Sequence, residues 1–131
     1  MNTQRFGRAS LRIQVLDANL GTVAQGLRVD VFLLGQKAAK LCSGKVGPDG
    51  EVNDPKLTGA RLEAGDYEVV FHVGDYYRAL DSDASPVPFL EDVTLRLGIG
   101  DSARCYYLPL EIGPYRFSMG RQMQEASPWQ G

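Results

Sequence analysis

The stretch Tyr106-Tyr-Leu-Pro-Leu-Glu-Ile-Gly-Pro-Tyr115 decides which fold this chain adopts. Side chains on a β-strand point alternately to its two faces, so one face of a strand here carries Tyr107, Pro109 and Glu111. Gly113-Pro114 favours a tight corner, because proline presets its own φ and glycine adopts conformations that are closed to other residues. The stretch therefore predicts a strand, a corner and a returning edge strand.

The same period of two recurs upstream of this stretch. Within residues 11–16 the odd positions are apolar and point one way, while Arg12, Gln14 and Leu16 point the other. Gly47-Pro-Asp-Gly50 is a strong turn sequence. We expect a short helix at residues 75–80 and strands at residues 11–16, 27–33, 39–46, 51–53, 67–73, 93–97, 104–112 and 115–119. About eight short strands with one short helix are typical of an all-β Greek-key sandwich.

Length and charge limit the possible classes of protein. With 131 residues, 44% of them apolar, the chain is expected to form one domain. That domain is expected at residues 11–121, after a flexible N-terminal arm (1–10) and before a polar C-terminal tail (122–131). The net charge of −2 gives no reason to expect nucleic acid or a membrane as partner. Because no apolar run could span a bilayer and no signal segment is visible, we expect a cytoplasmic protein.

Few side chains suit metal or nucleophilic chemistry. Cys42 and Cys105 show neither metal-ligand spacing nor a disulfide framework, so we expect two buried or half-buried free thiols and no metal or cofactor. A nucleophilic Cys105 stays an open alternative, because it lies two residues before Tyr107. The one histidine, His72, alternates against an inward Phe71 and is expected to be exposed.

Three blocks of sequence carry a resemblance to a known family. They are Gln14-Val-Leu-Asp-Ala-Asn-Leu-Gly21, Ser43-Gly-Lys-Val-Gly-Pro-Asp-Gly-Glu51 and the stretch from Tyr106 to Tyr115. In this order and spacing they resemble the transthyretin and 5-hydroxyisourate hydrolase family over residues 11–121. The resemblance implies a transthyretin-like sandwich that assembles with itself as a homotetramer, a dimer of dimers. It also implies small-molecule ligand sites in the channel between the dimers.

The resemblance, combined with the period of two, implies which side chains line that channel. The expected lining residues are Arg12, Gln14 and Leu16 from the first strand, Tyr107, Pro109 and Glu111 from the seventh, and Ser118 from the last. Arg121 is expected to join them, because it keeps its identity within the family's C-terminal motif.

The residues that carry hydrolysis in the family are replaced in this chain. The hydrolases use a histidine in the first strand, an arginine after the central turn and a histidine in the seventh strand. The matching residues here are Gln14, Glu51 and Tyr107, and the terminal Tyr-Arg-Gly-Ser becomes Gly120-Arg-Gln-Met123. The family's usual proton transfers are therefore not expected.

The replacements suggest altered chemistry. Glu51 can act as a base, Tyr107 as an acid or oxyanion donor, and Gln14 can orient a ligand. Exchanging arginine for Glu51 disfavours an anion and favours a neutral or cationic ligand. We expect a divergent enzyme that opens, hydrolyses or cyclises a small heterocycle; the alternatives are a non-catalytic binding protein and, third, a true 5-hydroxyisourate hydrolase. Each residue also has a structural explanation: Glu51 on a solvated turn, Tyr107 in packing, Gln14 as polar filler.

Overall fold

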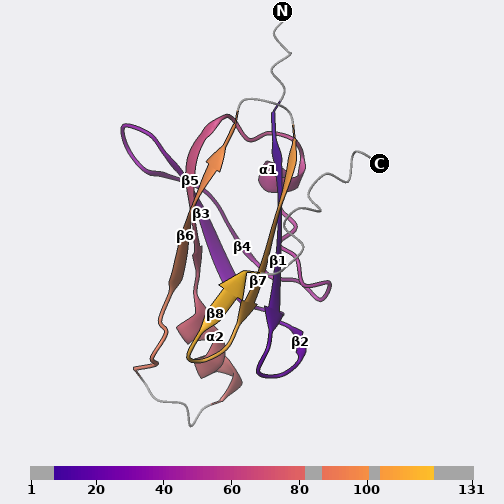
Figure 1. Ribbon diagram of the computed structural model, residues 1–131, viewed down its shortest axis with the longest axis vertical. Coiled ribbons are helices and arrows are strands. Elements are labelled where there is room, and N and C mark those ends of the chain that lie inside the picture. The colour runs from indigo at the N-terminus through magenta and orange to yellow at the C-terminus, as the bar shows by residue number, and fades with distance from the viewer. Residues whose placement is uncertain (1–7, 82–86, 101–103, 120–131) are drawn as a thin grey trace, which may run out of the picture.

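Two four-stranded sheets stack face to face in the computed structural model, which describes residues 8–81, 87–100 and 104–119 (Figure 1). One sheet has the order β2 (Thr22–Val23), β1 (Ser10–Asp17), β7 (Cys105–Ile112) and β8 (Phe117–Met119). The other has the order β4 (Ala39–Lys45), β3 (Arg28–Leu34), β5 (Gly65–Phe71) and β6 (Val93–Ile99). The predicted all-β sandwich of eight strands is confirmed.

The pairing of β1 with β7 joins distant parts of the chain. These two strands run parallel and side by side (Figure 1), whereas the neighbours in the other pairs are antiparallel. Arg12 lies opposite Tyr107 in this register, and the pairing continues without a shift to Asp17 opposite Ile112. Because side chains alternate along both strands, this register fixes which residues share a face.

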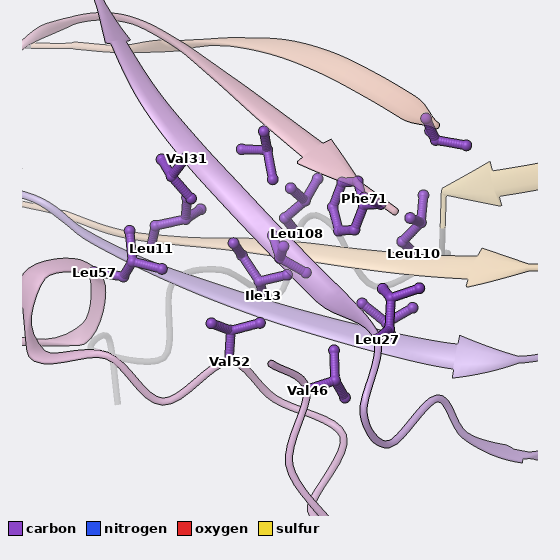
Figure 2. Packing of buried hydrophobic residues seen from close by; sticks show 14 of the residues in the cluster. Leu11, Ile13, Leu27, Val31, Val46, Val52, Leu57, Phe71, Leu108 and Leu110 are labelled. Carbon is purple, nitrogen blue, oxygen red and sulfur yellow. The ribbon is translucent and has the colours of Figure 1, made fainter. Parts of the chain in front are cut away.

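The core lies between the two sheets (Figure 2). Leu11, Ile13 and Val15 of β1 are each at most 2% exposed, as their alternation predicted. Leu108 of β7 and Phe71 of β5 pack into the same cluster. Burying one such side chain contributes about 1.5–3 kcal/mol, so the inward faces of β1 and β7 hold their outward faces in place.

The structure differs from the predicted elements in several places, including β5, which spans Gly65–Phe71 where residues 67–73 were expected. The strand expected at residues 51–53 is present only as isolated bridges, and β2 takes its place in the count of eight. The helix expected at 75–80 is α2 (Val73–Leu80), which starts two residues earlier. A further short helix, α1 (Pro55–Thr58), was not predicted, although Asp54 at its N-cap followed by proline is a helix-start signal. The last strand begins at Phe117, after the corner.

The prediction that His72 is exposed was wrong. Its side chain is 14% exposed, and its ring nitrogens lie 2.8 Å from Asp30 Oδ2 and 3.1 Å from Asp92 Oδ1. Burial tends to raise the pKa of Asp30, but hydrogen bonds from Ser43 and His72 outweigh it and lower that pKa. His72 does point away from the core as the alternation implied. Asp30 of β3 and Asp92, the residue before β6, cover the ring. The alternation within one strand does not indicate such contacts from other strands.

The described residues begin at residue 8, within the segment 1–10 that was expected to be a flexible arm. Ala9 is 2% exposed and its backbone pairs with Leu62. The tail at 122–131 and Arg121 just before it lie outside the described residues. Neither α1 nor α2, the helices of the described ranges, is long and apolar enough to cross a membrane.

Candidate functional site

The outward face of β1 and β7 gathers the residues predicted to bind a ligand. The parallel register sets Arg12 beside Tyr107, and two residues further along it sets Gln14 beside Pro109. Leu16 then lies beside Glu111, whose other neighbour across the sheet is Ser118 of β8. Six of these seven are at least partly exposed, while Pro109 is buried. Arg121 lies outside the described residues.

Glu51 reaches this face through the turn at residues 47–50. The amide of Val15 donates to the carbonyl of Gly50 over 2.9 Å, and Gln14 and Glu51 form an isolated antiparallel bridge. Asp49 Oδ1 also accepts the amide hydrogen of Glu51 at 3.0 Å, which holds the end of the turn. Glu51 therefore lies at the edge of β1, beside the outward face. An isolated bridge holds it there, and not the expected strand.

Arg12, Gln14, Glu51 and Tyr107 touch one another and are called the Arg12 cluster below. Arg12 Nε lies 2.9 Å from Glu51 Oε2, with the two side chains 47% and 20% exposed. The guanidinium carbon of Arg12 lies 4.7 Å from the centre of the Tyr107 ring, in a cation–π contact. The hydroxyl of Tyr107 donates to Gln14 Oε1. The structure thus brings together Gln14, Glu51 and Tyr107, the three residues expected from the sequence to take the catalytic positions.

Arg12 balances the negative charge that Glu51 introduces. The pKa of Arg12 is raised above its ordinary value, chiefly by the hydrogen bond with Glu51 and against the effect of burial. The pair keeps the turn end of the face near neutrality, so the preference against an anion that Glu51 implies is weaker there. A partly exposed pair of this kind stabilises the fold by at most about 1 kcal/mol. Its main effect is to orient two functional groups.

Asp17 supports the site from within and was not identified from the sequence. Its side chain is fully buried and accepts four hydrogen bonds: the amides of Asn19 and Leu20 and the hydroxyls of Tyr76 and Tyr77, at 2.8–3.0 Å. Burial, and then contact with Asp17, raises the pKa of both tyrosines. The sequence did contain a signal for a buried carboxylate, because the period of two puts Asp17 on the same inward face as Val15.

Two hollows adjoin the outward face, and both have Glu111 in their lining. One, of about 370 Å³, lies toward Leu16 and β2, and the other, of about 300 Å³, lies toward β8. A third hollow, of about 530 Å³, shares Pro114 and Tyr115 with the one toward β8, and none of the predicted site residues lines it. We place the candidate site on the outward face because the polar groups converge there.

The two thiols are free, as predicted, and they differ in their surroundings. Cys42 is buried and Cys105 half-buried. Burial, reinforced by the carboxylate of Asp54, raises the pKa of Cys42 to about 11. Cys105 precedes Tyr107 by two residues on β7, so it lies on the same outward face as the Arg12 cluster.

This contrast predicts selective thiol modification. At pH 8 without denaturant, we expect a disulfide reagent such as DTNB to modify Cys105 within minutes and to leave Cys42 intact, because roughly one part in a thousand of Cys42 is thiolate. Absorbance would count the thiols, with unfolded protein giving both and the Cys105→Ser variant giving no fast phase. Equal rates for the two thiols, or a silent Cys105, would contradict the prediction.

Fold and site together define a small all-β sandwich protein whose candidate site lies on the outward face of one sheet. The HIUase/Transthyretin family model matches residues 11–121, so the chain belongs to that family and has its transthyretin-like fold. The resemblance expected from the three sequence blocks is thereby confirmed.

Relatives and a solved structure agree with this assignment. The "5-hydroxyisourate hydrolase 2" of Rhizobium meliloti is 40% identical over 85% of this chain and 93% of its own length. A "5-hydroxyisourate hydrolase" of Deinococcus radiodurans is 34% identical over 88% of this chain and 97% of its own. The crystal structure of an (S)-allantoin synthase superposes with a TM-score of 0.77 at 28% identity. That match covers 88% of this chain and 44% of the synthase chain.

Proposed function

We propose that this chain is a divergent enzyme of the family that opens, hydrolyses or cyclises a small heterocyclic molecule. The observation that carries the proposal is the Arg12 cluster, in which an acid, a phenol, an amide and a guanidinium meet on one open sheet face. The relatives' names point to hydrolysis of 5-hydroxyisourate as related chemistry. The replaced histidines point to a different substrate or proton route.

Each member of the cluster has a role in this proposal. Glu51 uses one oxygen, Oε2, to hold Arg12, and within the described residues its other oxygen accepts no hydrogen bond. That oxygen is placed to take a proton from a water molecule or a ring nitrogen. Tyr107 donates to a developing oxyanion once a ligand displaces its bond to Gln14, and the Gln14 amide then orients the ring.

A second copy of the chain is proposed to complete the pocket. The Arg12 cluster lies on an open face, with the Arg12 side chain 47% exposed, so one chain alone does not shield a reaction from water. Two such faces meeting across a channel in a homotetramer would supply that enclosure. Sedimentation as a monomer at micromolar concentration would contradict this part of the proposal.

One observation favours a non-catalytic binding protein instead. The polar groups of the cluster are partly paired with one another: Arg12 holds Glu51, and Tyr107 holds Gln14. Groups that are already paired serve recognition well, whereas catalysis requires that they exchange partners. A binding protein would show saturable ligand binding without product at any protein concentration.

The test is turnover by the purified protein and by two variants. A panel of cyclic ureides, lactams and aminated heterocycles, with 5-hydroxyisourate included, would be followed by ultraviolet absorbance and mass spectrometry. For a substrate found in this way, we expect Glu51→Gln to lower kcat roughly a hundredfold or more, because it removes the proton acceptor but keeps the shape. Tyr107→Phe, which removes the oxyanion donor, is expected to lower kcat by a similar factor.

Glu68→Gln is the matched control for Glu51→Gln. Glu68 also pairs with an arginine, Arg96, at 3.3 Å, but it lies on β5 in the other sheet. This variant changes the net charge equally and is expected to leave kcat unchanged. Full turnover in both Glu51→Gln and Tyr107→Phe would refute the assigned acid–base roles.

A further inference from the structure

Glu111 stands apart from the Arg12 cluster on the same face, in a hollow of its own. It lies between Leu16 of β1 and Ser118 of β8 in the sheet register. The hollow of about 370 Å³ beside it also has Thr22 and Val23 of β2 in its lining. Its walls are therefore apolar at Leu16 and Val23, with a single exposed carboxylate at the rim.

The charges around this hollow all have the same sign. Its lining contains two acids, Asp17 and Glu111, and no lysine, arginine or histidine. Asp17 is fully buried with both oxygens engaged, so it contributes negative potential but offers no free acceptor. Within the described residues Glu111 makes no hydrogen bond or ion pair that would occupy it. Such a hollow attracts a cationic group and repels an anion.

The other side of Glu111 has one positively charged neighbour, Arg116, which forms no ion pair with it among the described residues. Arg116 and Glu111 both line the hollow of about 300 Å³ toward β8. No salt bridge within 4.0 Å joins them among the ion pairs of the described residues. Arg116 thus lies on the far side of Glu111 from Leu16 and Val23, and Glu111 stays open to a ligand.

Val23, in the lining of this hollow, lies next to the turn that carries Glu51 of the Arg12 cluster. Val23 packs against the turn so closely that a Cβ atom on Gly50 would lie 2.8 Å from Val23 Cγ1 and 3.7 Å from Gln14 Cγ. Glu111 is two residues along β7 from Pro109, the neighbour of Gln14, which is about 7 Å at the rise of a β-strand. That separation suits the two ends of one small bicyclic or substituted monocyclic molecule.

We infer that Glu111 is a specificity-determining residue that selects a ligand carrying an amidinium, guanidinium or ammonium group. The inference rests on the proposed function for the location of the reacting end, which lies at the Arg12 cluster. The cationic group occupies the hollow beside Leu16 and Val23 and pairs with Glu111. Arg12 is paired with Glu51 at the reacting end, which is therefore near neutral, so the ligand meets an unpaired negative charge at Glu111.

Three planar probes of nearly equal size test the charge preference: benzamidinium, benzamide and benzoate. Titration by ligand-observed NMR against the full-length protein is expected to rank them in that order for the wild type. Glu111→Gln is expected to weaken benzamidinium binding about fivefold, the effect of one partly exposed ion pair, and to leave benzamide unchanged. Glu68→Gln is the control, because it removes one negative charge from the other sheet and should not alter the ranking.

The outcomes separate this inference from the proposed function. Benzamide or benzoate binding as tightly as benzamidinium would overturn the inference, as would an undiminished preference in Glu111→Gln or no saturable binding of benzamidinium at millimolar concentration. Glu51→Gln is expected to keep the preference while it abolishes turnover. If Glu51→Gln kept full turnover, the proposed role of Glu51 as proton acceptor would fail, while the role of Glu111 would still be decided by the probe titrations.

Discussion

Replacement of Asp17 by alanine is expected to lower the free energy of unfolding by roughly 3–5 kcal/mol. The carboxylate is fully buried and accepts the hydroxyl hydrogens of Tyr76 and Tyr77 at 2.8 and 2.9 Å. Alanine would leave both hydroxyls facing a small cavity without an acceptor. It would also release the amides of Asn19 and Leu20, so the loop after β1 would lose its attachment to α2.

Urea unfolding at a fixed protein concentration measures this effect. Asp17→Asn is the informative partner variant, because its amide oxygen can keep the three bonds that Oδ1 accepts and only the contact with Tyr76 must change. Tyr77→Phe removes a single donor and is expected to cost about 1 kcal/mol. If Asp17→Ala lost less than the cost of that one donor, the buried carboxylate would not hold the loop and α2 together.

Gly50→Ala is expected to impair both stability and turnover. Gly50 has a φ of +85°, in the left-handed region that costs other residues about 1–2 kcal/mol. A Cβ atom there would also lie 2.8 Å from Val23 Cγ1, too close for any real contact. The turn must therefore shift, and its shift moves Glu51 away from Arg12. We expect a loss of roughly 2–4 kcal/mol in unfolding free energy and a fall in kcat approaching that of Glu51→Gln.

Gly21→Ala separates the two causes. Gly21 has a similar φ of +75°, but nothing lies within 4 Å of a Cβ atom built on it. This control carries the backbone cost alone, so the difference between the two variants measures the clash with Val23. Equal stabilities with unaltered turnover in Gly50→Ala would show that the turn does not position Glu51. Thermal unfolding and the turnover assay together decide the question.

The sequence was most informative where one strand or one turn determines the outcome. The odd residues of β1 from Leu11 to Val15 are buried, and their neighbours face outward, because the pleat allows no other arrangement once one face is apolar. Glycine and proline placed the turn before Glu51 for an equally local reason. The sandwich and the face that carries the candidate site followed from these patterns and from the family resemblance.

Local patterns failed where a side chain's partner lies far away in the chain. His72 was expected to be exposed because the alternation along its own strand gives no information about distant partners. Its ring nitrogen Nε2 in fact lies within hydrogen-bond distance of Asp30, 42 residues earlier in the chain. The strand expected at residues 51–53 is reduced to isolated bridges because Asp54, directly after it, caps helix α1. Short helices such as α1 are fixed by a cap and one buried leucine, a weak signal in a β-rich sequence.

The sequence by itself determined the β-sandwich and the outward face of β1 and β7, and it predicts that Gln14 and Tyr107 stand where the hydrolases have histidines. These are consequences of period-two alternation and of residue identity. Only the tertiary structure decided how the charges are arranged. Arg12 meets Glu51 across 39 residues and Asp17 meets Tyr76 across 59, through strand register and turn geometry. Electrostatic and hydrogen-bond partners depend on distance in space, which no single stretch of the chain records.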